Sequence, residues 1–223
     1  MRLELKNVGF RYGGADGTGR RYPWLFRGVN LSFEGGCRTV LLGDSGSGKT
    51  TLGRLMARHE IPCEGEITVS DTPAHSSQSA PSTRSAVFGK GCYPVQLILQ
   101  HPETAVNPRF KMRDILNEGW QPDSEMLDRL GIERSWLDRY PQELSGGELQ
   151  RFCIARALAP PVRFIIADEI TAMFDLITQA QIWDALLTET AARGLGLIVI
   201  THDRELARRL SPDTILMDDI IGR

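Results

Sequence analysis

The sequence predicts an α/β fold: a parallel sheet covered by helices, with a small antiparallel β subdomain and an inserted helical lobe. Three observations predict it. A glycine-rich loop lies between an apolar run and a helical segment, apolar strands alternate with helices in the second half, and apolar residues take a helical spacing between Met112 and Tyr140. With 223 residues the chain can form one large α/β domain.

The first third of the chain predicts the antiparallel β subdomain. Residues 2–12 alternate apolar and polar side chains, and Val29, Leu31 and Phe33 repeat that alternation, so we expect two half-buried strands. Residues 65–69 predict a further β segment. A glycine-rich stretch at 13–19 predicts a flexible loop, and the Ser- and Pro-rich residues 70–86 predict an exposed excursion.

The glycine-rich loop at residues 43–50 fits the pattern Gly-x4-Gly-Lys-Ser/Thr. It follows the apolar run 39–42 and precedes a predicted helix at 51–59. Glycines let successive N–H groups point at phosphate oxygens, and the N-terminus of the following helix adds partial positive charge. Lys49 would reach the β- and γ-phosphates and the Thr50 hydroxyl would ligate Mg²⁺. The alternative is a glycine-rich turn that binds nothing.

The remaining elements follow in order. Apolar runs predict strands at 95–99, 164–167, 195–200 and 214–217, and periodic segments predict helices at 152–158, 178–193 and 204–210. Between them, Pro122, Gly131 and Pro141 divide the helical stretch into two or three short helices that form a separate lobe. The Ser-Gly-Gly turn at 145–147 precedes the helix at 152–158 and is a second candidate anion site.

Polar residues stand where the apolar strands end. Ligands of open α/β sheets bind outside the carboxyl ends of the strands, so we expect Gly43, Gln100, Asp168, Glu169 and His202 to converge there. Asp168 could hold Mg²⁺, and Glu169 could orient and deprotonate an attacking water. Taken alone, two acids after a strand also fit helix capping, and a lone histidine there fits a cap or a core hydrogen bond.

Composition limits the partners and the compartment. The formal net charge is −2 with 24% charged residues, so no long-range basic field indicates a nucleic-acid partner. The first residues lack the apolar block of a signal peptide, and no apolar stretch approaches membrane-helix length. Four cysteines without metal-ligand spacing predict reduced thiols in or near the core of a cytoplasmic protein.

One ordered set of motifs resembles a known family over nearly the whole chain. Tyr12, Gln100 and His202, with residues 43–51, 144–151 and 164–169, resemble the ATP-binding-cassette (ABC) ATPase domain. The most specific part is Leu-Ser-Gly-Gly-Glu-Leu-Gln-Arg at 144–151. Within that family, residues 100–109 and 137–144 resemble the nucleotide-binding subunits of oligopeptide, dipeptide and nickel importers.

The resemblance implies an ABC-type nucleotide-binding domain with a RecA-like core. Residues 1–223 would form a single domain, with 1–107 and 152–223 as core and β subdomain and about 108–151 as helical lobe. ATP and Mg²⁺ would be the cofactors. The residues implied to bind ATP are Tyr12, Gly43, Asp44, Ser45, Gly46, Ser47, Gly48, Lys49, Thr50, Thr51, Asp168, Ser145, Gly146 and Gly147. Those implied to contact Mg²⁺ are Thr50, Gln100 and Asp168, and those implied in catalysis are Glu169, His202 and Gln100.

The same resemblance implies partners. Ser145, Gly146 and Gly147 would grip the γ-phosphate of ATP bound to a second ABC ATPase subunit, the same chain or a different one. Transmembrane permease subunits and an extracytoplasmic solute-binding protein would complete an importer, with this chain peripheral on the cytoplasmic face of the membrane. A non-transport ABC ATPase acting on DNA or the ribosome is the alternative, and a small-molecule phosphotransferase is a third interpretation.

The sequence departs from the family pattern just after Glu169. Ile170 stands where the family usually has a proline, and Ala172 stands where it usually has a serine that contacts the other subunit, whereas Asp175 is kept. We therefore expect altered communication between subunits, and an asymmetric pair with a different ATPase is possible. Since the sequence ends at Arg223, a C-terminal regulatory extension is not expected.

Overall fold

The structure is a computed structural model that describes residues 1–13, 22–70, 92–211 and 213–221. Most of the predicted loop at 13–19 and nearly all of the predicted excursion at 70–86 lie outside these residues. Among the helices of the described chain, none has the length and apolar character needed to cross a membrane.

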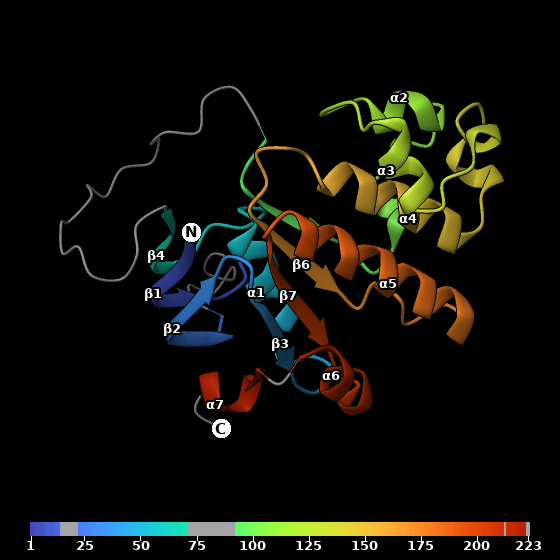
Figure 1. Cartoon of the computed structure of the whole chain (residues 1–223). Coiled ribbons are helices and arrows are strands. Elements are labelled where there is room, and N and C mark those ends of the chain that lie inside the picture. The colour runs from blue at the N-terminus through green and yellow to red at the C-terminus, as the bar shows by residue number, and fades with distance from the viewer. Residues whose placement is uncertain (14–21, 71–91, 212, 222–223) are drawn as a thin grey trace.

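A five-stranded parallel sheet forms the centre of the molecule (Figure 1). Its strand order is β5-β6-β7-β3-β8, and every neighbouring pair is parallel. The strands are β3 (Arg38–Leu42), β5 (Val95–Ile98), β6 (Phe164–Asp168), β7 (Gly196–Thr201) and β8 (Thr214–Leu216). The predicted parallel sheet is therefore confirmed.

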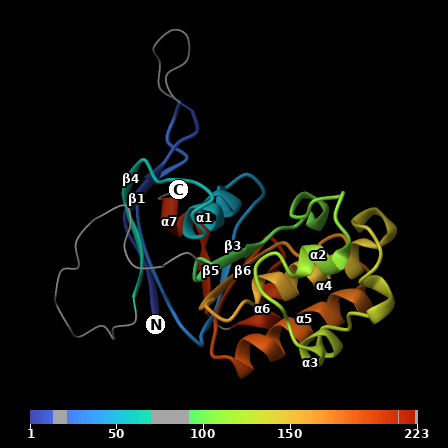
Figure 2. The same cartoon turned by 90° about the horizontal axis from the view of Figure 1, so that it is seen from above.

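A three-stranded antiparallel sheet stands beside the parallel one, as Figure 2 shows from above. It contains β1 (Arg2–Phe10), β2 (Phe26–Glu34) and β4 (Glu64–Ser70) in the order β2-β1-β4. Leu5 of β1 pairs with Leu31 of β2 and with Ile67 of β4, so the alternating apolar residues share a register. The predicted β subdomain has this third strand at its edge.

Helices cover both faces of the parallel sheet. The larger ones are α1 (Lys49–Met56), α4 (Gly146–Ala157), α5 (Leu176–Ala192) and α6 (Arg204–Leu210). Short helices fill the predicted lobe: α2 (Met112–Leu116), α3 (Ser124–Arg129), and the 3-10 turns η2 (Arg134–Trp136) and η3 (Pro141–Glu143). A further 3-10 turn, η1 (Pro102–Thr104), follows β5, and α7 (Met217–Ile221) ends the described chain.

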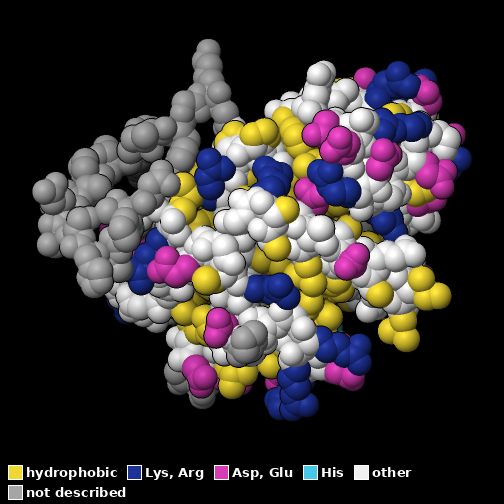
Figure 3. All heavy atoms as spheres, in the orientation of Figure 1, with side chains coloured by type: hydrophobic (Ala, Val, Ile, Leu, Met, Phe, Trp, Pro, Cys, Tyr) yellow, Lys and Arg dark blue, Asp and Glu magenta, His cyan; other side chains and the backbone are white. Residues whose placement is uncertain are grey.

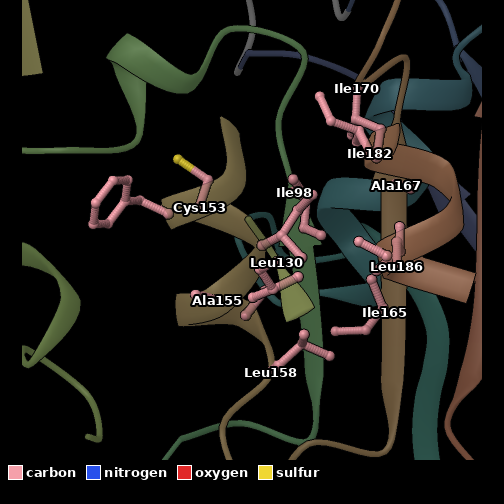
Figure 4. Packing of buried hydrophobic residues seen from close by; sticks show 14 of the residues in the cluster. Ile98, Leu130, Cys153, Ala155, Leu158, Ile165, Ala167, Ile170, Ile182 and Leu186 are labelled. Atoms are coloured by element: carbon pink, nitrogen blue, oxygen red, sulfur yellow. The ribbon is translucent and has the colours of Figure 1, made fainter. Parts of the chain in front are cut away.

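The core divides into two apolar clusters, one on each face of the parallel sheet. Alternate strand residues supply them, since Ile165 and Ala167 of β6 pack into one cluster and Phe164 and Ile166 into the other. The first cluster joins the sheet to α2–α6, as Figure 4 shows for strand residues that face α4 and α5. The second joins the sheet to α1 and to the antiparallel sheet. Burial on both faces explains why these strands are nearly continuous apolar runs.

Several predicted boundaries are wrong. The second-half helix begins at Gly146 instead of residue 152, and the helix after the loop spans Lys49–Met56 instead of residues 51–59. Met217 begins α7 instead of ending the last strand. The cysteine prediction is wrong in part, because Cys37 and Cys63 are exposed, although all four thiols are free.

Charged side chains of both signs are interspersed on the face shown in Figure 3. They are dense over the helical lobe, where Lys and Arg alternate with Asp and Glu. Ion pairs there include Arg113 with Asp138 and Arg156 with Glu118. On this face Lys and Arg side chains lie among Asp and Glu side chains.

Candidate nucleotide site

The register of the parallel strands brings the predicted polar residues to one edge of the sheet. Leu42, the last residue of β3, pairs with Thr201, the last residue of β7. Asp168, the last residue of β6, pairs with Ile200, and Ile98 of β5 pairs with Ala167. The residues that follow these strand ends are the glycine-rich loop, His202, Glu169 and the half-buried Gln100.

The glycine-rich loop has the curled backbone that its glycines permit. Gly46 and Gly48 adopt φ values of 81° and 97°, in the left-handed region that side chains disfavour. Lys49 is only 5% exposed, and its Nζ donates to the carbonyl oxygens of Gly43 and Asp44 at 2.7 Å each. Burial lowers the pKa of this ammonium, and nearby carboxylates oppose the shift. The lysine thus holds the loop while keeping one N–H for a further acceptor.

Oxygen donors in and beside the loop suit a phosphate group with a divalent cation. The Ser47 hydroxyl is buried and has no hydrogen-bond partner within the described residues. Asp168, 4% exposed, forms a hydrogen bond with the Thr50 side chain. A carboxylate and a hydroxyl side by side are ligands that Mg²⁺ accepts. Burial raises the pKa of Asp168 above its ordinary value, and the Thr50 bond acts in the opposite direction.

Glu169 and His202 form a close pair at this edge. The imidazole Nδ1 lies 2.6 Å from Glu169 Oε1, with the glutamate side chain 17% exposed and the histidine 52% exposed. Glu169 has a φ of 49°, and its N–H donates to the Ile200 carbonyl oxygen at 3.0 Å. A left-handed glutamate at a strand end is a strained position of the kind that clusters at functional sites.

Tyr12 lies next to the first turn of α1. Its hydroxyl is 2.6 Å from Thr51 Oγ1, and its ring meets Phe10 edge-on with centroids 5.0 Å apart. The tyrosine is 48% exposed, whereas Thr51 is 6% exposed. The Tyr12 hydroxyl therefore contacts the first turn of α1, and the Thr51 hydroxyl is already engaged.

The Ser-Gly-Gly turn at residues 145–147, called the signature turn below, forms the N-terminus of α4. The Ser145 hydroxyl accepts from the Glu148 N–H, and the Glu148 carboxylate accepts from the Ser145 N–H, which makes a capping box. Ser145 and Gly146 are exposed. The turn packs near Phe174 and Thr178 instead of joining the glycine-rich loop of the same chain. It also borders an open cavity of about 500 Å³ between α4, α5 and the lobe.

Sequence reasoning missed three residues that shape this region. The charge of Arg54 in α1 opposes the rise in the pKa of Asp168. Met217 packs against Gly43, and a Cβ added to Gly43 would lie 2.8 Å from the Met217 Cβ. Phe174 covers Gly146, where an added Cβ would lie 3.0 Å from the ring. An arginine inside a helix and apolar residues near a turn carry no motif, so only the fold reveals them.

The segment that departs from the family pattern is largely exposed. Ala172 and Met173 face solvent, and Asp175 accepts hydrogen bonds from the N–H groups of Ile177 and Thr178 as the N-cap of α5. These bonds, led by that with the Thr178 hydroxyl, hold the pKa of Asp175 below its ordinary value. The retained aspartate thus has a clear local role in starting a helix.

Comparisons with known proteins agree with this geometry. The profile of the ABC transporter family matches residues 26–172. The chain is 33% identical to the nickel import ATP-binding protein NikE of Escherichia coli (strain K12), over 94% of this chain and 80% of that protein. It is 32% identical to the metal-staphylopine import system ATP-binding protein CntF of Staphylococcus aureus (strain NCTC 8325 / PS 47), over 96% and 86%. A solved dimeric ATP-binding cassette in a post-hydrolysis state, bound to ADP and Pi, shares the fold with a TM-score of 0.73 at 24% identity, covering 96% of this chain and 93% of that chain.

Proposed function

The chain belongs to the ABC transporter family, and from this membership we propose that it is the ATP-hydrolysing motor of an importer for nickel, another metal chelate or peptides. ATP binding and hydrolysis are what the family shares. The narrower claim of import rests on the relatives, which are import ATP-binding proteins, and on the importer-like segments at 100–109 and 137–144.

The observation that carries the proposal is the Glu169–His202 pair beside the glycine-rich loop. A glutamate held at 2.6 Å by an imidazole is fixed in orientation and can accept a proton from a water. We assign Glu169 as the general base and His202 as the residue that positions it. Gln100, at the end of the neighbouring β5, completes the catalytic group.

The loop and β6 supply the nucleotide and metal contacts. Residues 43–51 would hold the phosphates through backbone N–H groups and Lys49, and Tyr12 would stack on the adenine. Thr50, Asp168 and Gln100 would hold Mg²⁺, which would neutralise charge on the phosphates. Carboxylate, hydroxyl and amide oxygens are ligands that Mg²⁺ accepts. The side chains of Thr50 and Asp168 already lie side by side, joined by a hydrogen bond.

The signature turn would act on a second subunit. Ser145 and Gly146 are exposed at the start of a helix of 12 residues, whose N–H groups and dipole favour a phosphate. Since the turn does not meet the loop of its own chain, we propose that it completes the site of another ABC ATPase subunit. Two half-sites sharing each ATP give the nucleotide a higher affinity for the closed pair, which is what drives closure.

The remaining partners follow from the importer proposal. Permease subunits would receive the motion through residues 100–109 and the helical lobe at about 108–151, and a solute-binding protein would deliver the solute outside. The chain would then sit peripherally on the cytoplasmic face of the membrane. No nucleic-acid partner is part of this proposal.

Replacing Glu169 with glutamine tests the catalytic assignment. Glu169→Gln keeps the shape of the side chain but removes the base, so the assembled complex should bind ATP normally and hydrolyse it about 10²–10⁴-fold more slowly. The matched control is Glu66→Gln on the exposed antiparallel sheet, which should leave turnover unchanged. Turnover near that of the unaltered complex in Glu169→Gln would contradict the assignment.

Purification tests the transport proposal separately. A tagged chain recovered from its own cells should bring down membrane permease subunits, identified by mass spectrometry. Recovery of DNA or ribosomes without any membrane protein would favour the non-transport alternative.

A further inference from the structure

The end of β6 is followed by a turn at residues 169–174, which we call the acidic turn. The Ala172 N–H donates to the Glu169 carbonyl oxygen, and the Phe174 N–H donates to the Thr171 carbonyl oxygen, both at 3.1 Å. Ile170 is 1% exposed and Thr171 is 3% exposed, whereas Ala172 faces solvent. Thr171 is therefore the point at which the acidic turn is anchored in the core before the chain reaches the surface.

Glu169 depends on its surroundings for its orientation. Its φ of 49° is a backbone conformation that persists only when the neighbouring structure holds it. Its carboxylate is paired with the imidazole of His202, but that side chain is itself 52% exposed. The direction in which the carboxylate points therefore depends on the backbone of the acidic turn as well as on the histidine.

One face of α5 holds the acidic turn at two points. Trp183 Nε1 donates to Thr171 Oγ1 at 3.0 Å, and one helical turn earlier Gln179 Nε2 donates to the Phe174 carbonyl oxygen at 2.9 Å. The indole is 6% exposed, so its N–H would lose its partner if the threonine moved away. A buried donor without an acceptor is unfavourable, and the bond thus resists displacement of Thr171.

We propose that Trp183 is a positioning residue for ATP hydrolysis, because through Thr171 it fixes the backbone that aims Glu169 at the attacking water. The Thr171 anchor lies two residues from the glutamate, inside the span that the bond from Ala172 closes. A misplacement of about 1 Å can slow a reaction about 10²-fold. The middle of α5 therefore affects turnover without touching the nucleotide. This inference rests on the proposed role of Glu169.

Removing the acceptor hydroxyl tests the inference. Thr171→Val keeps the shape of the side chain but loses the oxygen, so kcat of the assembled complex should fall about 10- to 100-fold. The ATP Kd should stay the same, because the glycine-rich loop is unchanged. Thr171→Ser keeps the hydroxyl and should restore most of the lost kcat.

Thr190→Val is the matched control. This threonine also belongs to α5, is 4% exposed, and donates from its hydroxyl to the Leu186 carbonyl oxygen at 2.8 Å. The substitution makes the same chemical change at equal burial on the same helix, away from the acidic turn. It should leave kcat and the ATP Kd unchanged.

Two combined variants separate positioning from a loss of packing. Thr171→Val together with Trp183→Phe should be no slower than the slower single variant, because both substitutions remove one bond. In the Glu169→Gln chain, which lacks the base, Thr171→Val should lower kcat no further. A further fall of the full size in that chain would show that the hydroxyl does not act through Glu169, and would overturn the inference.

Folding is checked by urea midpoints, and Trp183→Phe replaces Thr171→Val in these comparisons if the latter does not fold. A folded variant lacking the bond whose kcat equals that of Thr190→Val overturns this inference alone. Failure of the unaltered complex to hydrolyse ATP overturns the proposed function, and the inference with it.

Discussion

Asp168, one of the proposed Mg²⁺ ligands, shows at the scale of one residue how a buried carboxyl group affects stability. Its carboxyl group is buried at the end of β6, and burial raises its pKa in spite of Thr50, Lys49 and Arg54. A raised folded-state pKa favours the neutral acid, so this group's contribution to stability is present below its unfolded pKa and is lost as pH rises through the folded value. The ionised form of Asp168 is therefore the less favourable one in the metal-free fold.

We expect Asp168→Asn to raise the urea midpoint of the metal-free chain at about pH 7, because the variant removes the buried charge but keeps the shape. The gain should shrink as the pH falls, because the raised pKa of Asp168 favours its neutral form on the acid side. The same variant should lose Mg²⁺-dependent ATP hydrolysis. Equal urea midpoints for the two proteins at neutral and at acid pH would contradict the electrostatic account.

The residues that carry recognisable chemistry could be placed from the sequence, and those that support them could not. The strand ends near Gly43, Asp168 and His202 could be predicted because a buried apolar run that stops at a glycine or a polar residue is a local pattern. The bond between Tyr12 and Thr51 joins residues 39 apart in sequence. Contacts of that kind depend on how the two sheets meet, which no local pattern encodes.

At the scale of elements, the pairing of β6 with β7 places the Phe164 ring over Gly196, which leaves no room for a side chain at position 196. A Cβ on Gly196, the first residue of β7, would lie 2.4 Å from the Phe164 ring and 3.1 Å from the Glu34 carbonyl oxygen. Phe164 is fully buried and cannot move aside easily. Position 196 therefore has room for glycine alone beside the Phe164 ring.

Gly196→Ala should destabilise the chain by about 1–3 kcal/mol through overpacking, seen as a lower urea midpoint with an unchanged slope. Gly119→Ala is the control, since no atom lies within 4 Å of a Cβ added there. A Gly196→Ala midpoint equal to that of the control would show that the phenylalanine relaxes freely.

Element types were predicted better than element ends. Two glycines at 146–147 lower helix propensity, so the sequence favoured a later start for α4. The capping box of Ser145 and Glu148 outweighs that penalty and begins the helix at Gly146. Near the end of the described chain, the predicted strand extended to Met217, whereas in the structure this residue begins α7. Met217 is buried against Gly43, a tertiary contact that local propensity does not encode.

At the scale of the whole molecule, the site is incomplete on the surface that carries the signature turn. Beside that turn, three large apolar side chains are exposed: Met173 at 62%, Leu176 at 82% and Ile177 at 72%. They surround Asp175 at the start of α5, next to Phe174 and Gly146. Apolar side chains gathered on an otherwise charged surface are typical of a binding interface. This surface therefore supports the proposal that a second ATPase subunit binds here.

Gly146→Asp tests whether the signature turn binds the partner's nucleotide. An acidic residue in the first turn of a helix is favourable for the fold, but a Cβ at Gly146 would lie 3.0 Å from the Phe174 ring, so that ring has to shift slightly. The monomer should still fold and bind ATP at its own loop, which far-UV circular dichroism and an ATP titration check. Across the interface the added carboxylate would repel the γ-phosphate, so ATP-driven dimerisation of the Glu169→Gln form, measured by light scattering, should be lost. Gly119→Asp makes the same change in open space on the lobe and should leave dimerisation intact. If the Glu169→Gln chain forms no dimer alone, Gly146→Asp and Gly119→Asp are compared in the presence of the co-purified ATPase partner. The Gly146→Asp variant of the Glu169→Gln form is compared with the Gly119→Asp control at the same ATP concentration. If both form dimers, the signature turn does not contact the partner's nucleotide.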